Sequence, residues 1–410
     1  MKTLEFFYDF SCPYAYLAST RIERLAKAGG AELVYKPFLL GGVFNALGAT
    51  PMQMPEPKAK LNLLDMRRWA DHWGVPLQMP SGHPNRTVLA LRAALASKDL
   101  PRASRALFDA YWREAHDVSD PKVVADALTR AGFDGDALVA QAEDPAIKDE
   151  LRKRTDEAIE RGVFGAPTIF LDGELYWGQD RLHLVARELG GDALDALAPH
   201  EREPDAAPAR SIDFYFDFSS PYAYLGATQI DALSKRTGVE VVWKPFLLGG
   251  LFKAIGTPMV PIAAVSAAKR RHYLADLERH ARLYGVPFKF PSQFPMNTLN
   301  PLRLSIAAQQ AGLDVAKLNL AIFRAYWVEN RDISNLDELR RICEETGIDA
   351  ALVARVEDSG IKAALRALTD EAHARGLCGA PSFVVDGEVF WGQDRIGFVE
   401  RAIRGWRARR

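Results

Sequence analysis

Cysteine is scarce in this chain of 410 residues, which contains only Cys12, Cys343 and Cys378. Cysteines so few and so far apart exclude a disulfide framework, and they lack the paired spacing of a zinc site. The eight histidines show no HExxH or similar spacing, so we expect no resident metal. These absences are typical of a metal-free protein in a reducing compartment.

Excess charge of one sign and long apolar runs are also missing. The 52 basic and 53 acidic residues nearly cancel, which argues against a nucleic-acid or membrane-surface partner. No apolar run reaches the roughly 18 residues of a transmembrane helix. The opening MKTLEFFYDF predicts a strand rather than a secretory signal. We therefore expect a cytoplasmic protein.

What the sequence does contain is a second copy of itself. FFYDFSCPYAYLAST (6–20) matches FYFDFSSPYAYLGAT (214–228) at ten of fifteen positions. KPFLLGG, GVP, AYW, GAP and WGQDR each recur in the same order. Such a repeat predicts two domains of about 200 residues, a normal domain size. We expect domains at 1–198 and 211–410, joined by an Ala-, Pro- and charge-rich linker at 199–210.

Each copy has the same predicted order of elements. LEFFYDF is a short apolar strand, and a helix follows with Pro13 in its first turn. AELVYKPFLL is a second strand, and residues from about 43 to 160 have helical periodicity. A hairpin that turns at Asp172-Gly173 and a last helix from Asp180 complete the copy. This order predicts an α/β thioredoxin-type sheet with a large α-helical insertion in each of two tandem domains.

The residue just before the first-helix proline is Cys12 in the first copy and Ser220 in the second. This N-cap position meets free backbone N–H groups and the positive end of the helix dipole. Such surroundings favour a thiolate, whether the protein's own or a ligand's. A serine hydroxyl there can donate a hydrogen bond to a ligand thiolate. The alternative interpretation of Ser220 is a plain helix cap.

Three motifs taken together resemble one enzyme family. D-F-S-S-P-Y-A-Y-L, K-P-F-L-L-G-G and G-A-P…D-G-E…W-G-Q-D-R resemble the 2-hydroxychromene-2-carboxylate isomerases, which are grouped with kappa-class glutathione transferases and the DsbA-like thioredoxin fold. The resemblance covers nearly all of both copies. It implies glutathione as cofactor and a serine, here Ser220, that contacts the glutathione sulfur. The first copy differs from the family pattern because it has Cys12 in place of this serine. Its CPYA sequence resembles half of a CxxC redox motif.

The resemblance also implies cofactor-binding residues, namely a cis-proline with its preceding alanine, a Gln-Asp pair before the last helix, and a lysine. These residues are Lys58, Ala166, Pro167, Gln179 and Asp180 in the first copy, and Lys269, Ala380, Pro381, Gln393 and Asp394 in the second. The alternatives are a trans proline that starts a strand, a helix-capping Asp and a solvated surface lysine. On the substrate side the resemblance implies Asn297 and its counterpart Arg86, with a helix-cap region as the alternative.

The predicted activity is glutathione-dependent cis–trans isomerisation of a 2-hydroxychromene-2-carboxylate-like intermediate of aromatic degradation. It proceeds by thiolate addition, bond rotation and elimination. A second hypothesis is glutathione transfer or thiol–disulfide exchange through Cys12, although no second cysteine follows in the tetrad. A third treats the first copy as a non-catalytic support. Because single-domain relatives are commonly dimers, we expect an intramolecular pseudo-dimer with a small-molecule substrate.

Overall fold

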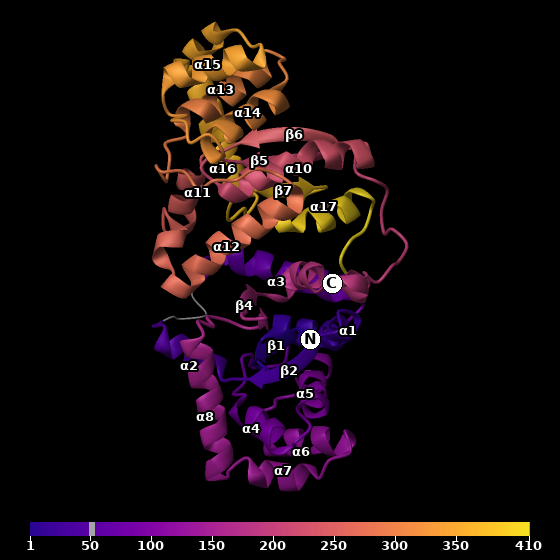
Figure 1. Cartoon of the computed structure of the whole chain (residues 1–410). Helices are drawn as coiled ribbons and strands as arrows, with labels where there is room; N and C mark the ends of the chain where they lie inside the picture. Colours follow the sequence, from indigo (N-terminus) through magenta and orange to yellow (C-terminus); the bar gives the residue numbers. More distant parts are fainter. Residues whose placement is uncertain (49–53, 410) are drawn as a thin grey trace.

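The computed structural model describes residues 1–48 and 54–409 and contains one four-stranded sheet in each copy (Figure 1). The first sheet has β1 (Thr3–Tyr8), β2 (Glu32–Pro37), β3 (Thr168–Leu171) and β4 (Glu174–Trp177), and the second has β5 (Ser211–Phe216), β6 (Glu240–Pro245), β7 (Ser382–Val385) and β8 (Glu388–Trp391). The strand orders are β2-β1-β3-β4 and β6-β5-β7-β8. β1 and β2 are parallel and the other pairs of the first sheet are antiparallel, as in the second sheet. The predicted α/β fold is confirmed.

The helices also repeat between the copies. The first copy has α1 (Pro13–Ala28), α2 (Leu40–Ala46), α3 (Glu56–Trp73), α4 (Val88–Ala96), α5 (Leu100–Phe108), α6 (Pro121–Arg130), α7 (Gly135–Gln141), α8 (Pro145–Glu160) and α9 (Leu182–Leu189). The second has α10 (Pro221–Thr237), α11 (Leu248–Ile255), α12 (Ala267–Tyr284), α13 (Leu299–Gln310), α14 (Val315–Trp327), α15 (Leu336–Thr346), α16 (Ser359–Ala374) and α17 (Ile396–Ile403). The helices between β2 and β3, and between β6 and β7, are the predicted insertions. Within the described ranges, no helix combines the length and apolar character that crossing a membrane requires.

Local sequence explains the first helix and the hairpin. Pro13 is the first residue of α1, where its missing N–H costs no hydrogen bond. Ala18, Ile22 and Leu25 form the fully buried face of that helix. The β3–β4 turn places both Asp172 (φ 49°) and Gly173 (φ 88°) in the left-handed region that a tight two-residue hairpin requires. The predicted turn is therefore confirmed.

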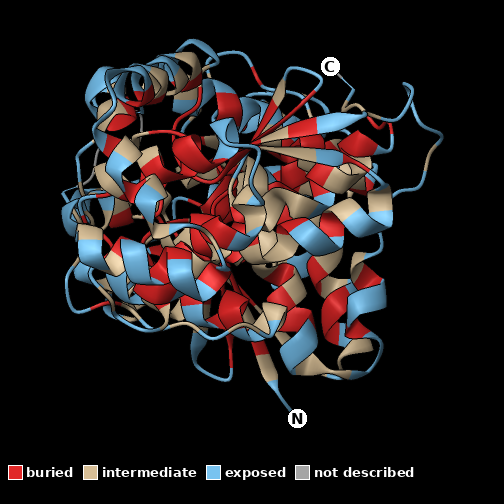
Figure 2. Cartoon of the chain, turned by 90° about the horizontal axis from the view of Figure 1, so that it is seen from above, coloured by how far each residue is buried: buried red, intermediate tan, exposed pale blue. Residues whose placement is uncertain are grey.

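The two copies pack against each other through their middle elements. Figure 1 places α4–α7 and α13–α15 at opposite ends of the molecule, with α3, α12 and α17 between the two sheets. Leu61 of α3 is buried in the hydrophobic core of the second copy, and Leu283 of α12 packs on the core of the first. The buried residues in Figure 2 accordingly fill the inside of the molecule. Each copy therefore supplies one long helix to its neighbour's core.

The segment 199–210 contains no helix or strand but is held by hydrogen bonds. Its Ala209 N–H donates to the carbonyl of Ile403 at 2.8 Å, at the end of α17. Arg202 lies 3.1 Å from Asp71 of α3. The segment thus touches both copies. The domain boundaries at 198 and 211 stay a prediction.

Candidate active site

Cys12 and Ser220 lie at matching positions, the N-caps of α1 and α10. The Ser220 hydroxyl accepts the N–H of Ala223 at 3.1 Å and donates to the carbonyl of Ala380 at 2.8 Å. The Cys12 thiol donates to the carbonyl of Ala166 at 3.0 Å. Each side chain therefore bridges the start of the first helix to the strand that follows the helical insertion. The prediction that both residues stand at the helix N-terminus is confirmed.

The cis-prolines predicted beside these side chains are present. The Ala166-Pro167 and Ala380-Pro381 bonds are both cis. No described residue accepts a hydrogen bond from the N–H of either alanine. A free N–H next to a carbonyl at the end of a strand can pair with an extended peptide ligand. The chemistry of this edge is therefore the same in both copies.

A buried carboxylate that the sequence reasoning missed supports each site. Asp9, which is 1% exposed, accepts hydrogen bonds from the N–H of Ser11 at 2.9 Å, the N–H of Leu40 at 2.8 Å and the hydroxyl of Thr87 at 2.7 Å. Asp217 makes the same contacts in the second copy. These bonds tie the start of α1 to α2 and α4. The repeated D-F-S signal was in the sequence, but the partners lie 31 and 78 residues away.

The surroundings of Cys12 do not favour a thiolate, contrary to the general expectation for a helix N-terminus. Burial raises the pKa of Cys12 to about 12, and hydrogen bonds from the backbone of Ala15 and Tyr14 oppose this only in part. The charge of Asp9 adds to the rise. Cys12 is therefore a neutral thiol near pH 7. Desolvation outweighs the helix dipole here.

The two Gln-Asp pairs lie in short turns that precede the last helix of each copy. Gln179–Arg181 and Gln393–Arg395 form short 3-10 turns, so α9 begins at Leu182 rather than at the predicted Asp180. Gly178 has φ 102°, and a Cβ on it would lie 2.4 Å from the Asp180 carboxylate. Glycine is therefore required in WGQD, because the carboxylate folds back over this turn.

Asp180, Arg181, Asp394 and Arg395 form a closed ring of ion pairs, which we call the ion ring. Asp180 lies 3.0 Å from Arg181 and 2.8 Å from Arg395. Asp394 lies 2.8 Å from Arg181 and 3.0 Å from Arg395. Each aspartate thus binds one arginine of its own copy and one of the other. Neither carboxylate is free, although both were predicted to hold a ligand ammonium.

Two outer carboxylates extend the ion ring. Asp65 of α3 binds Arg395 through two hydrogen bonds of 2.7 and 2.9 Å, and Asp276 of α12 binds Arg181 likewise at 2.8 and 3.1 Å. Burial raises the pKa of Asp65; for Asp276, Arg181 overcomes the burial effect and lowers the pKa. Four carboxylates face two guanidinium groups in this buried cluster. When all are ionised, two negative charges are unmatched.

Each predicted lysine points to the other copy. The Lys58 ammonium lies 5.5 Å from the ring of Trp391, and the Lys269 ammonium lies 4.9 Å from the ring of Trp177. The role of either lysine in binding a glutathione carboxylate stays a prediction. Only the tertiary arrangement of α3 and α12 brings these residues together.

The two lysines differ in their surroundings. Lys269 lies within 6 Å of three ring centroids, those of Phe164, Trp177 and Tyr273. Burial, and then the nearby charge of Lys58, lowers the pKa of Lys269. Lys58 is exposed, as the surface alternative predicted. Cys378 replaces Phe164 in the second copy, and burial raises its pKa to about 12.

The predicted substrate-side residues are both exposed. Asn297 accepts the N–H of Leu299 at 3.1 Å, as the helix-cap alternative predicts. Arg86 has the same place before α4. Each is followed by the buried threonine, Thr87 or Thr298, that binds the supporting aspartate. The structure thus brings these residues to the edge of the site, with no contact that assigns them a role.

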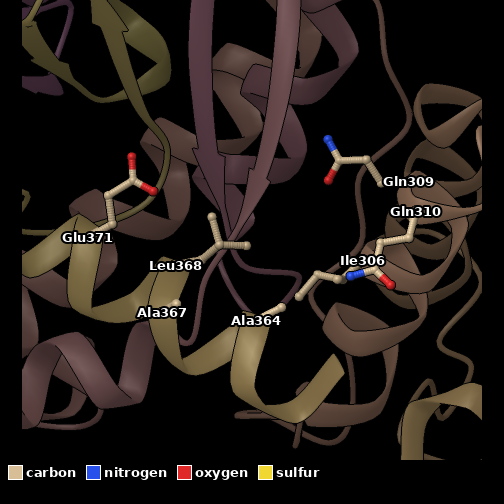
Figure 3. Close-up of a pocket in the computed structure, with 7 residues that line it drawn as sticks. All are labelled: Ile306, Gln309, Gln310, Ala364, Ala367, Leu368 and Glu371. Carbon is tan, nitrogen blue, oxygen red and sulfur yellow. The ribbon is translucent and has the colours of Figure 1, made fainter. Parts of the chain in front are cut away.

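Two hollows occur away from the N-caps. A hollow of about 220 Å³ between the copies is lined by both aspartates of the ion ring and by aromatic side chains, among them Trp69, Trp73 and Phe398. A groove of about 430 Å³ between α13 and α16 is lined by Ile306, Gln309, Gln310, Ala364, Leu368 and Glu371 (Figure 3). The groove contains none of the predicted site residues. The hollow between the copies, in contrast, is lined by the predicted residues Gln179, Asp180 and Asp394.

Comparison with known sequences agrees with this geometry. The model of the DSBA-like thioredoxin domain matches residues 3–190 and again 211–404. The 2-hydroxychromene-2-carboxylate isomerase of Sphingobium xenophagum is 33% identical over 189 residues, which are 45% of this chain and 96% of that protein. Glutathione S-transferase kappa 1 of Homo sapiens is 25% identical over 215 residues, which are 48% of this chain and 95% of that protein.

Among solved structures, a 2-hydroxychromene-2-carboxylate isomerase is 30% identical with a TM-score of 0.42 and covers 46% of this chain and 94% of its own. The cytosolic disulfide reductase DsbM of Pseudomonas aeruginosa with GSH is 19% identical with a TM-score of 0.36 and covers 47% of this chain and 99% of its own. Each of these relatives corresponds to about half of this chain.

Proposed function

The chain belongs to the family of DsbA-like thioredoxin domains that includes 2-hydroxychromene-2-carboxylate isomerases and kappa-class glutathione transferases, and on that premise we propose that it isomerises a 2-hydroxychromene-2-carboxylate-like acid with glutathione as cofactor. The curated isomerases at 32–33% identity support an isomerase. The kappa-class relatives support the choice of glutathione.

The observation that carries this proposal is the hydroxyl of Ser220. It lies at the N-cap of α10 and 2.8 Å from the carbonyl of Ala380, the residue before cis-Pro381. A ligand that pairs with the free N–H of Ala380 would bring its own atoms close to this hydroxyl. The hydroxyl could then turn from the carbonyl to a ligand sulfur. Charge on that sulfur would also be stabilised by the N-terminus of α10.

The residues present fit glutathione. When bound, glutathione supplies a thiolate that adds reversibly to a conjugated carbon, so that a double bond can rotate as a single bond. Ser220 holds this sulfur by a hydrogen bond and lowers its pKa. Ala380 and Pro381 hold the peptide backbone, as Ala166 and Pro167 would in the first copy. Asn297, or Arg86 in the first copy, contacts the substrate.

The ion ring fits the charged end of the same tripeptide. Together with the outer carboxylates Asp65 and Asp276, the ion ring has two more negative than positive charges, which would favour a ligand ammonium near Asp180 or Asp394. Gln179 and Gln393 are each 2% exposed, and each has one side-chain polar atom without a hydrogen-bond partner among the described residues. Such buried unpaired atoms mark a place where a polar ligand group can bind. Lys58 and Lys269 are the proposed partners of a ligand carboxylate.

The test is isomerisation of 2-hydroxychromene-2-carboxylate followed by absorbance, with and without glutathione. We expect no turnover without glutathione and a large loss of rate in Ser220→Ala. Equal rates with and without glutathione, in enzyme freed of bound thiols, would exclude the cofactor role. An undiminished rate in Ser220→Ala would remove this hydroxyl from the mechanism.

A supporting role for the first copy is the second candidate function. The observation that favours it is the neutral, buried thiol of Cys12, which also disfavours thiol–disulfide exchange. The two copies would then act as an intramolecular pseudo-dimer in which one site reacts. Calorimetry that finds one glutathione site per chain would favour this role, and two equal sites would contradict it.

A further inference from the structure

Two equivalent tyrosines, Tyr14 and Tyr222, lie in the first turn of α1 and α10. Each comes two residues after the N-cap position, Cys12 or Ser220, and each is half-buried. Burial raises the pKa of both phenols well above its usual value, so both keep their proton near pH 7. Each tyrosine is thus a possible hydrogen-bond donor beside a candidate site.

The hydroxyls of Tyr14 and Tyr222 differ in whether they already donate a hydrogen bond within the protein. The Tyr14 hydroxyl donates to the side-chain oxygen of Asn62 at 2.8 Å and lies 3.2 Å from its carbonyl. In the second copy, Tyr273 takes the place of Asn62 on α12. Within residues 1–48 and 54–409, the Tyr222 hydroxyl has no hydrogen-bond partner. One substitution on a neighbouring helix has therefore released this donor.

The helices that carry these tyrosines begin at the N-caps and pack against the turns that carry the ion ring. α1 contacts the Gln179–Arg181 turn and α3, and α10 contacts the Gln393–Arg395 turn and α12. Nearby carboxylates, Asp65 and Asp180 for Tyr14 and Asp276 and Asp394 for Tyr222, add to the effect of burial in raising the pKa of each phenol. A tripeptide whose sulfur lies at the N-cap and whose ammonium lies at the ion ring has to pass these tyrosines. Its amide carbonyl between those two groups is a hydrogen-bond acceptor.

We propose that the Tyr222 hydroxyl donates a hydrogen bond to the glutathione backbone, and that Tyr14 makes no such bond because Asn62 holds it. This inference rests on the proposed function, since it names a further binding residue of the same site. This hydrogen bond would give the second copy the higher affinity for glutathione. A single neutral hydrogen bond is worth about a five- to tenfold change in affinity.

The first experiment is titration of glutathione by calorimetry into the full chain and into Tyr222→Phe, with Tyr14→Phe as the matched control. We expect Tyr222→Phe to weaken one site about five- to tenfold. Tyr14→Phe should leave both affinities within about twofold, because no free donor is lost. Equal affinities in Tyr222→Phe and the unaltered chain would overturn the inference. No binding to the unaltered chain would instead refute the proposed function.

A second variant tests the same idea without removing the hydroxyl. Tyr273→Asn restores the acceptor that holds Tyr14 in the first copy, so it should weaken glutathione binding as Tyr222→Phe does. The double variant Tyr222→Phe/Tyr273→Asn should be no weaker than Tyr222→Phe, because both changes remove one hydrogen bond. Additive losses in the double variant would contradict the inference. Where Tyr222→Phe fails to fold, Tyr273→Asn alone decides: unchanged glutathione affinity in this variant would overturn the inference.

Discussion

The two candidate sites share one backbone and differ in the atom at the helix N-terminus. Both have a cis-proline, a free alanine N–H and a buried aspartate beneath the first turn. In the second copy a serine hydroxyl donates to the carbonyl of Ala380, whereas in the first copy burial holds Cys12 as a neutral thiol. A helix N-terminus therefore does not make a reactive cysteine by itself. The solvent excluded around the sulfur decides its pKa.

The contact between the copies shows a second difference. The arginines and aspartates of the ion ring are the same in both copies, but the histidines around it are not. In the alignment of the two copies, His72 corresponds to Leu283, and His272 corresponds to Leu61. The shared charges therefore hold the copies together, while the histidines make the two halves unequal.

The largest expected effect is the loss of stability when an arginine of the ion ring, which both copies share, is removed. Arg181→Met and Arg395→Met each leave buried carboxylates unpaired, so each should lower the free energy of unfolding by about 3–5 kcal/mol. The two losses should be equal, because the ion ring is reciprocal. Urea unfolding measures both, with Arg341→Met, an exposed arginine, as a control within about 0.5 kcal/mol. Clearly unequal losses would break the equivalence of the two halves.

The next effect concerns the atoms at the N-caps. Ser220→Ala removes the donor to a ligand sulfur and should lower the rate of isomerisation about 100-fold. Cys12→Ala should change the rate less than about twofold, since a neutral S–H is only a weak hydrogen-bond donor to a sulfur anion. Steady-state rates with saturating glutathione measure both. Greater loss in Cys12→Ala than in Ser220→Ala would reverse the assignment of the active copy.

The histidines provide a pH-dependent test. Burial lowers the pKa of His72 to about 3 and of His272 to about 4. As pH falls below about 6.5 the unfolded chain takes up these protons while the folded chain does not, so stability falls. Each histidine should account for about 2 kcal/mol between pH 6.5 and 4.5.

His72→Leu and His272→Leu, which introduce the residue of the other copy, should each flatten this fall. Exposed His373→Leu is the control and should leave the slope unchanged. Thermal melting across this pH range measures the slope. Burial also lowers the pKa of His183 to about 4, so part of the slope should remain in the double variant. A slope as steep as that of the unaltered chain would contradict the role of His72 and His272.

The smallest expected effect separates the two lysines. Lys269→Met removes a cation held among three rings and should cost about 1 kcal/mol of stability. Lys58→Met, beside one ring and exposed, should stay within about 0.5 kcal/mol. Chemical unfolding of the two single variants gives the comparison. Equal losses would show that the aromatic surroundings of Lys269 add nothing.

The sequence by itself determined the repeated α/β fold, the hairpin turn and the choice of serine or cysteine at each N-cap. The cis-prolines were expected only from the resemblance to a family, because few X–Pro bonds in folded proteins are cis. The repeat and the turn depend on neighbours in the chain or on motifs with fixed spacing. Pro13 and the Asp172-Gly173 pair, for example, restrict the backbone where they stand. Such local rules need no knowledge of the rest of the molecule.

Only the tertiary structure decided the partners and the pKa values. Asp180 meets Arg395, which is 215 residues away, and Lys269 lies over an aromatic ring of the other copy. No motif carries such contacts, because they depend on how α3 and α12 cross between the sheets. The neutral state of Cys12 likewise follows from burial, which is a property of the packed molecule and not of the CPYA motif.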